Sequence, residues 1–382
     1  MFRFEEERGY WANLKVIGIG GGGSNAVDRM IASQIRGVEF IAVNTDAQAL
    51  RASKASRKIQ IGAMITDGLG AGSDPEIGRQ AAEEDKDLIR ESLEGANMAF
   101  FTAGMGGGTG TGGIPVAASI AREMGILSVA IVTKPFTFEG RKRKMQAEKG
   151  LKELEGKVDT LIVIPNDRLL KVSGDHAPLI EAFRIADDVL YHGVKGISEL
   201  ITTPGLINLD FADVRTVMKD GGEALMGMGS ASGDGKAINA VKLAISSSLL
   251  EDISLEGATR VLFNITGSID LEMNEANEAA SLIYKIVGED ANIIFGVVSD
   301  ENMKNEVRVT IIASGFDKKK SLAQPEKGTE LDFSSYANQN LDRPAFRRRN
   351  IIEKYGVELD EEKKVYASNN LEIPTFLRNK IM

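Results

Sequence analysis

The run GMGGGTGTGG at residues 104–113 constrains the fold of this chain more than any other segment. It follows ANMAFFTAG, which predicts a buried strand, and it leads into residues 113–124, which predict a helix. Glycine lets backbone N–H groups approach an anion closely, and a helix N-terminus adds partial positive charge. Because regular elements flank the run tightly, it is not a flexible linker. We interpret it as a phosphate-binding loop.

Another glycine loop, GIGGGG at residues 18–23, comes first along the chain; it follows the predicted strand LKVIGIG and opens a predicted helix at 24–33. It satisfies the dinucleotide fingerprint G-x-G-x-x-G, although a tight strand-to-helix turn also needs glycine for steric reasons. The next predicted strand, VEFIAVN, runs into Asn44-Thr45-Asp46 rather than the lone acid of a dinucleotide fold. Two loops can hold a longer phosphate chain than one, and no G-x-x-x-x-G-K-[ST] is present. We therefore expect a nucleoside triphosphate held without a Walker lysine.

The pattern around both loops alternates short apolar runs with amphipathic stretches. Further strands are predicted at LSVAIVT and DTLIVIPN, and further helices at 76–93 and 142–154. Strands that alternate with helices are typical of a parallel sheet covered by helices on both faces. The prediction is an α/β domain of Rossmann type, with the glycine loops at the carboxyl ends of its strands.

A different texture begins after a long predicted helix at 178–201. Beyond residue 221, a predicted helix at 234–247 precedes three closely spaced runs typical of strands: TRVLFNITG, ANIIFGVVSD and EVRVTIIASGF. Their alternation and spacing predict a second, α+β domain with a mixed sheet that ends near residue 316.

The last part of the chain changes composition again. Residues 317–368 carry KKK, RRR and DEEKK runs with few aliphatic side chains, which cannot bury enough apolar surface to fold. Apolar residues return in NNLEIPTFLRNKIM, where Ile373, Phe376 and Leu377 make one side of a short helix or extended turn apolar, and Pro374 can occupy the first turn of such a helix. A frayed terminus is the plain alternative. We expect a disordered linker with a partner-binding peptide at its end.

The composition excludes several classes of function. The chain has no cysteine and two histidines, His176 and His192, which excludes disulfides, thiolate nucleophiles and metal centres rich in cysteine or histidine. A net charge of −9 argues against sequence-independent nucleic-acid binding. The acidic N-terminal residues are unlike a signal peptide, and no run of about eighteen apolar residues predicts a membrane span. We expect a cytoplasmic protein with no nucleic-acid partner and no direct membrane insertion.

Six segments in a fixed order carry a resemblance to a known family. GGGTGTGG is similar to the tubulin signature, and it is accompanied by IGIGGGGSNAV, AVNTDAQAL, GLGAGSDPEIG, KPFTFEGRKR and GLINLDFADVR. With LEIPTFLR near the end, these segments resemble the FtsZ branch of the tubulin/FtsZ family, the cell-division GTPases of bacteria. The resemblance runs from about residue 15 to residue 316, with the terminal peptide in addition.

The resemblance implies a tubulin-like fold in which GTP is bound and hydrolysed to GDP and phosphate. The implied organisation is a flexible N-terminus at 1–12, a GTP-binding domain at 13–177, a central helix and catalytic loop region at 178–222, a C-terminal mixed-sheet domain at 223–316, a disordered linker at 317–368 and a partner-binding peptide at 369–382.

The family's nucleotide-binding positions carry over onto matching residues of this chain. Phe183 is implied to stack on guanine, and Asp187 to accept hydrogen bonds from the edge of the base. Mg²⁺ is implied as a cofactor held by phosphate oxygens and water rather than by dedicated protein ligands. The implied GTP-binding residues are Gly21, Gly22, Gly23, Ser24, Asn25, Asn44, Asp46, Ala71, Gly72, Gly107, Gly108, Thr109, Gly110, Thr111, Glu139, Arg143, Asn166, Phe183 and Asp187.

Residue chemistry alone leaves several of these roles open. A carboxylate pairs well with two adjacent donors on guanine, but spacing cannot choose between Asp187 and Asp188. Phe183, taken alone, is more typical of a core position than of a stacking platform. Glu139 and Arg143 are four residues apart, so they can form a simple helical ion pair. The resemblance favours the functional role in each case.

Hydrolysis of a phosphate anhydride needs a positioned water and charge compensation, and no carboxylate lies inside either glycine loop. Asp210 and Asp213 in NLDFAD are candidates, although their spacing is also a good helix start, which the local sequence favours. The resemblance instead implies that this loop enters the next subunit's pocket. There Asp210 and Asp213 would orient the attacking water, and Asn208 would contact the phosphates. A head-to-tail contact that does not close generates a filament.

The resemblance thus implies a polymerising GTPase of the bacterial division ring at midcell. Its terminal peptide is implied to recruit membrane-tethering proteins of the FtsA, ZipA or SepF kind. Two alternatives stay open at this point. A dinucleotide-dependent oxidoreductase would use residues 18–23 but would leave the second loop without a role. A nucleotide-binding scaffold that hydrolyses poorly would have no need of the intact NLDFAD loop.

Overall fold

The computed structural model of the protein describes residues 12–316, apart from 174–177, 204, 208, 248–254, 256, 269, 289 and 301–302. Residues 1–11, the predicted linker and the predicted terminal peptide, with Ile373, Pro374, Phe376 and Leu377, lie outside the described residues, and so does Asn208.

The first half of the fold is a parallel sheet with the strand order β3-β2-β1-β4-β5-β6. This is the doubly wound order, in which the chain reverses direction across the sheet between β1 and β4. The predicted Rossmann-type sheet is confirmed. The six strands are β1 (Leu14–Ile19), β2 (Val38–Asn44), β3 (Arg57–Gln60), β4 (Met98–Gly104), β5 (Leu127–Lys134) and β6 (Thr160–Pro165).

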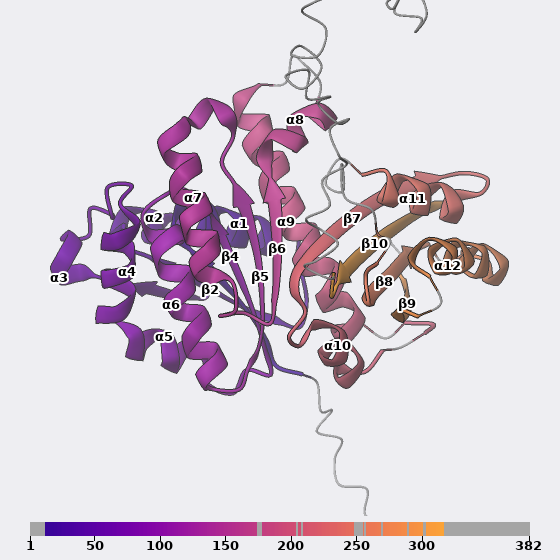
Figure 1. Cartoon of the computed structure of the whole chain (residues 1–382), viewed down its shortest axis with the longest axis horizontal. Coiled ribbons are helices and arrows are strands. Elements are labelled where there is room, and N and C mark those ends of the chain that lie inside the picture. Colours follow the sequence, from indigo (N-terminus) through magenta and orange to yellow (C-terminus); the bar gives the residue numbers. More distant parts are fainter. Residues whose placement is uncertain are drawn as a thin grey trace, which may run out of the picture. The chain divides into compact units, whose positions relative to one another are not determined.

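Helices cover both faces of this sheet. Side chains alternate along each strand, so Phe100 packs into one core with α1 and α9, and Phe101 packs into the other with α4 to α7. Figure 1 shows α4 to α7 in front of the strands. The helices of this half are α1 (Gly20–Ala32), α2 (Ala47–Ala52), α3 (Ala63–Thr66), α4 (Pro75–Glu84), α5 (Lys86–Leu93), α6 (Thr109–Glu123), α7 (Arg141–Leu154) and α8 (Asn166–Ser173).

The helix predicted at 76–93 is wrong as a single element. It is two helices, α4 and α5, that meet at Asp85. The Asp85 carboxylate accepts a hydrogen bond of 2.7 Å from the backbone N–H of Gly62. This tertiary contact joins the break between the helices to the loop after β3, and the amphipathic pattern of the sequence carries no trace of it.

Helix α9 (Leu179–Thr202) is the predicted central helix, confirmed to within one residue at each end. Its 24 residues span about 36 Å at 1.5 Å per residue. The helix starts beside α8, at the carboxyl end of β6, and a loop at its other end leads to α10 (Phe211–Met218). Figure 1 shows α8 at the top of the view and α10 at the bottom. Helix α9 therefore joins two opposite ends of the molecule.

The second half continues the same sheet as β7 (Gly222–Ser232), β10 (Glu306–Ser314), β8 (Arg260–Gly267) and β9 (Asn292–Ser299). The predicted mixed sheet is confirmed, because β8 and β9 are parallel while β10 is antiparallel to both β7 and β8. Helices α11 (Lys236–Ile245) and α12 (Met273–Val287) pack on this half and share its apolar core. No helix among the described residues is long and apolar enough to cross a membrane.

Strand β7 was not predicted from the sequence. Its residues GEALMGMGSAS contain no β-branched side chain, so intrinsic preference does not favour a strand. Its conformation comes from pairing on both sides, parallel to β6 at Gly222 and antiparallel to β10 along most of its length. Tertiary pairing therefore overrides local propensity here.

Candidate functional site

The two glycine loops meet where the strand order reverses. β1 and β4 are parallel neighbours, and each loop follows the carboxyl end of its strand. Gly20 has a φ of +73°, and a Cβ there would lie 2.7 Å from the backbone nitrogen of Gly110. Any larger residue at position 20 would separate the loops. The two glycine runs are therefore one structure, in which the backbone of the first loop contacts that of the second.

Other glycines of these loops face open space. Nothing lies within 4 Å of the place that a Cβ would take at Gly21, Gly72 or Gly107. Gly72 belongs to a third loop between α3 and α4, and this loop touches the second because a Cβ at Gly108 would lie 2.8 Å from Ala71 Cβ. Three loops thus present exposed backbone together, which is the arrangement that a phosphate chain requires.

Several predicted site residues support the loops from beneath. A Cβ at Gly23 would lie 2.4 Å from the Thr102 carbonyl oxygen, so Gly23 packs against β4. The buried hydroxyls of Thr45 and Thr109 lie 2.6 Å apart. Thr111 Oγ1 accepts a hydrogen bond of 2.8 Å from the Gly106 N–H. Both threonine hydroxyls that the sequence offered to phosphate therefore already stabilise the loops.

The predicted polar residues after β2 have local structural roles as well. Asp46 is the N-cap of α2, and its carboxylate accepts from the backbone N–H groups of Gln48 at 2.8 Å and Ala49 at 3.0 Å. Asn44 is buried, and its side-chain oxygen accepts from the Asp46 N–H at 3.3 Å. Asn25, by contrast, is exposed on α1 directly after the first glycine loop.

Four buried side-chain oxygen atoms have no hydrogen-bond partner among the described residues, and two of them belong to predicted site residues. These two are Ser24 Oγ, on α1, and Asn166 Oδ1, at the start of α8. Leaving a buried polar atom unsatisfied costs about 1–3 kcal/mol, and folded proteins rarely tolerate it. Both atoms lie on elements that follow the carboxyl ends of strands, where a ligand or water can satisfy them.

Asp187 and Asp188 have different environments in the structure. Asp188 accepts a hydrogen bond of 2.6 Å from Arg29 Nε, which also makes an ion pair. No hydrogen bond or ion pair of Asp187 is found among the described residues. Burial raises the pKa of Asp187 to about 7, the negative charge of Asp188 adds to the rise, and Arg29 opposes it. Of the two acids, Asp187 is therefore the one whose carboxylate oxygens can still accept hydrogen bonds from a ligand.

Three aromatic rings gather at the carboxyl end of β5. The rings of Phe136 and Phe138 are stacked with centroids 4.9 Å apart, and Phe183 of α9 meets Phe136 edge-on at 5.4 Å. Phe138 and Phe183 are both exposed. The sequence singled out Phe183 but missed the other two, although they lie together in the KPFTFEGRKR segment. The cluster leaves apolar ring surface exposed beside the second glycine loop.

Glu139 and Arg143 form the simple ion pair that their spacing allows, with Arg143 Nη1 donating to Glu139 Oε2. The other Glu139 oxygen accepts from the Phe136 N–H at 2.9 Å, so this side chain also holds the aromatic loop in place. A Cβ at Gly106 would lie 2.7 Å from the Arg143 carbonyl oxygen, which brings the start of α7 against the second glycine loop.

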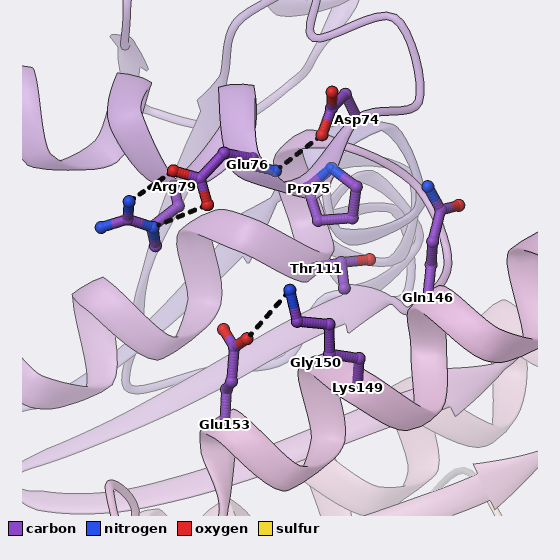
Figure 2. A pocket seen from close by; sticks show the side chains of 9 residues that line it. All are labelled: Asp74, Pro75, Glu76, Arg79, Thr111, Gln146, Lys149, Gly150 and Glu153. Atoms are coloured by element: carbon purple, nitrogen blue, oxygen red, sulfur yellow. Dashed lines mark hydrogen bonds and ion pairs between the residues drawn. The ribbon is translucent and has the colours of Figure 1, made fainter.

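Behind the second loop lies a pocket of about 220 Å³ between α4 and α7. Figure 2 shows that both cationic side chains of its lining pair with acids, Arg79 with Glu76 and Lys149 with Glu153, while the Asp74 carboxylate accepts from the Glu76 N–H. Arg79 also pairs with Glu83. Both cations of the lining are therefore already paired and Asp74 adds negative charge, so this pocket does not suit a phosphate and is not the cradle formed by the three loops.

Asp210 and Asp213 form the helix start that the local sequence favours. The Asp213 N–H donates to Asp210 Oδ1 at 2.8 Å, and the Asp210 N–H donates to Asp213 Oδ2 at 3.3 Å. This capping box opens α10, at the other end of α9 from the aromatic cluster. Within one chain the structure therefore does not bring these acids to the glycine loops.

Comparisons with known proteins agree with this geometry. The model of the tubulin/FtsZ family GTPase domain matches residues 13–174, and the model of the FtsZ family C-terminal domain matches residues 222–317. An empty FtsZ dimer from M. jannaschii is 44% identical with a TM-score of 0.77, over 80% of this chain and 88% of that one. A point mutant of the FtsZ from M. jannaschii has the same identity and TM-score, over 80% of this chain and 92% of that one.

A more distant structure shares the fold. CetZ1 from Haloferax volcanii, a GDP-bound monomer, is 21% identical with a TM-score of 0.68, over 80% of this chain and 95% of that one. The predicted tubulin-like fold and the resemblance stated from the sequence are both confirmed by these comparisons.

The buried Asp187 predicts a specific dependence of stability on pH. Its pKa is about 7 in the folded chain against an ordinary 3.8, so its contribution to the free energy of unfolding is full below about pH 4 and is lost as the pH rises to about 7. We expect Asp187→Asn to raise the melting temperature of the nucleotide-free protein more at about pH 8 than at about pH 5. Asp188→Asn should give a smaller gain, because it removes only the lesser cause of the raised pKa and also loses the Arg29 ion pair. An equal change at both pH values would contradict the raised pKa.

Proposed function

Because the chain belongs to the FtsZ family of GTPases, we propose that it assembles head to tail and hydrolyses GTP between adjacent subunits. One observation carries the proposal. The phosphate cradle lies toward the start of the 24-residue helix α9 and the acid pair lies beyond its end, and the helix alone is about 36 Å long. Each end therefore supplies half of a catalytic site, and a second copy of the chain supplies the other half.

The three glycine loops are proposed to hold the phosphates of GTP. Open backbone at Gly21, Gly72 and Gly107 would face the phosphate oxygens, and the positive end of α6 would attract them. Gly22, Gly23, Ala71, Gly108 and Gly110 hold the loops close enough to act together, with Thr45, Thr109 and Thr111 beneath them. Asn44 and Asp46 would hold the loop after β2 in place.

Guanine is proposed to lie between the aromatic cluster and α9. Phe183 would stack on the base, and Asp187 would accept hydrogen bonds from its N1–H and its amino group. The choice of Asp187 over Asp188 rests on the engagement of Asp188 by Arg29. Ser24, Asn25 and Asn166 would contact the base or ribose, and Asn166 Oδ1 would gain the partner that it lacks. Glu139 and Arg143 would border the sugar and phosphates.

Exposed apolar side chains lie at both ends that must meet. Leu69 is 85% exposed just before the third glycine loop, and Ile180 is 81% exposed at the start of α9. Leu206 is 74% exposed in the loop that leads to the acid pair. Large exposed apolar residues at two complementary ends favour a head-to-tail contact, which propagates as a filament. The FtsZ of M. jannaschii with 44% identity has been described as a dimer.

Asp210 and Asp213 are proposed to act in the next subunit's cradle, where they would orient the attacking water, with Asn208 near the phosphates. Mg²⁺ bound to the phosphates would neutralise charge that develops during hydrolysis. Among the described residues there is no cluster of three side chains able to hold a metal, so phosphate oxygens and water would supply its ligands. The capping role and the catalytic role are compatible, because a capping carboxylate retains free lone pairs.

At the level of the cell, we propose that the filament forms the division ring at midcell. The terminal peptide at 369–382 would bind membrane-tethering proteins of the FtsA, ZipA or SepF kind through Ile373, Pro374, Phe376 and Leu377. The linker at 317–368 would set its reach. This part of the proposal rests on family membership and on the composition of the tail.

Exchanging the base-reading acid should exchange the preferred base. Asp187→Asn turns one acceptor into a donor, which suits xanthine, where a carbonyl replaces the amino group of guanine. We expect GTP affinity to fall by roughly tenfold to a hundredfold and xanthosine triphosphate affinity to rise above it, as measured by calorimetric titration. Asp188→Asn is the matched control and should keep its preference for GTP. Equal weakening of both nucleotides would assign Asp187 a structural role only.

Removing one acid of the pair should separate binding from hydrolysis. Asp213→Ala should bind GTP with unchanged affinity, because the cradle lies at the other end of α9, and should lose GTP turnover by roughly a hundredfold or more. Asp87→Ala is a matched control, since Asp87 is also an acid in the first turn of a short helix. Phosphate release at saturating GTP measures the effect. Unchanged turnover in Asp213→Ala would contradict the shared site.

A further inference from the structure

The loop that leads to the acid pair is hydrogen-bonded to β9, at the edge of the sheet. Strand β9 is the last strand of the sheet, and Ile207 forms an antiparallel bridge with its residue Val297. The Val297 carbonyl oxygen accepts from the Leu206 N–H at 2.9 Å and from the Ile207 N–H at 3.4 Å. In return the Val297 N–H donates to the Ile207 carbonyl oxygen at 3.3 Å. These bonds act three residues before Asp210.

The alternation of β9 leaves Val297 free for this role. In a parallel pair, a strand bonds its neighbour through every second residue. The N–H group of Asn292 donates to the carbonyl oxygen of Thr259, directly before β8, and that of Asp300 donates to the carbonyl oxygen of Gly267, the last residue of β8. The backbone N–H and C=O groups of even-numbered residues of β9 therefore bond to β8. Those of odd-numbered residues point to the open edge of the sheet. Val297 can hold the loop without breaking a bond inside the sheet.

Side-chain packing reinforces the backbone bridge at Gly296. A Cβ there would lie 2.4 Å from Leu200 Cδ2 and 3.3 Å from Leu209 Cδ1. Leu200 belongs to the last turns of α9, and Leu209 directly precedes Asp210. Leu209 and Phe211, on either side of Asp210, both pack against the main apolar core. The absence of a side chain at position 296 is thus what lets both ends of the loop rest on β9.

We propose that Gly296 and Val297 are positioning residues for the acid pair, acting through Leu209 and Ile207. The proposal rests on the shared site proposed above, in which Asp210 and Asp213 act on the GTP of the next subunit. Its consequence is that the outer edge strand β9 sets the position of the two acids. A displacement of β9 relative to α9 would move the acids, while the cradle at the other end of α9 would stay unchanged.

Two variants of the full-length chain test this placement. Val297→Pro removes the N–H that donates to Ile207, and proline is tolerated at an edge position whose N–H points out of the sheet. Gly296→Ala instead presses on Leu200 and Leu209. Both should bind GTP as tightly as the parent and should lower kcat at saturating GTP by about tenfold or more, since a misplacement of about 1 Å can cost a hundredfold. Loss of GTP affinity in step with kcat would contradict a positioning role.

Ile293→Pro is the matched control for the proline variant. Ile293 lies on the same edge strand with the same outward parity, four residues from the bridge. The Ile293→Pro variant should keep the GTP turnover of the parent, although it also removes an outward-pointing backbone N–H from β9. If Ile293→Pro lowered kcat as much as Val297→Pro, the effect would belong to β9 as a whole and the bridge would have no specific role.

Mixing variant subunits tests the positioning role separately from the shared catalytic site on which it rests. An Asp187→Asn subunit is expected to bind GTP poorly but to carry an intact acid loop, so it can complete the cradle of a Val297→Pro or Gly296→Ala subunit. Turnover should return on mixing, as it should when Asp213→Ala is mixed with Asp187→Asn. Rescue of Asp213→Ala without rescue of the β9 variants would overturn the positioning role. Rescue of neither would overturn the shared site.

Discussion

Helix α9 sets the distance on which the rest of the structure depends. Its start carries Asp187 and Phe183, and its end leads through a short loop to Asp210 and Asp213. A continuous helix of 24 residues cannot bring its two ends together. The cradle and the acid pair are therefore separated by construction. This separation makes assembly, rather than a movement within one chain, the step proposed to complete the catalytic site.

Each end of α9 is built by contacts that leave little freedom. At the nucleotide end, Gly20 and Gly110 bring two loops into backbone contact, and the buried pair Thr45 and Thr109 lies beneath them. At the acid end, the capping box opens α10 and the bridge to Val297 holds the preceding loop. The proposed catalysis needs groups that are fixed before the reaction begins, and the contacts at both ends are consistent with this requirement.

The sequence predicted those features whose causes are local. Glycine runs between a strand and a helix predict phosphate loops, because the backbone chemistry lies in the run itself. The choice between Asp187 and Asp188 could not be made, since it depends on Arg29, which is 159 residues away. Strand β7 and the break at Asp85 are likewise imposed by partners distant in sequence. Phe136 and Phe138 were not singled out from the sequence, because only the fold brings them beside Phe183.

The central claim is that a complete catalytic site exists only between two subunits, and the rate per molecule tests it most directly. GTP turnover per subunit should be measured by phosphate release across protein concentration, with light scattering recorded alongside. The structure predicts a rate near zero in dilute protein, which rises above a threshold concentration together with scattering. A rate per subunit that stayed constant down to well-diluted monomer would contradict the claim, because one chain would then carry the whole site.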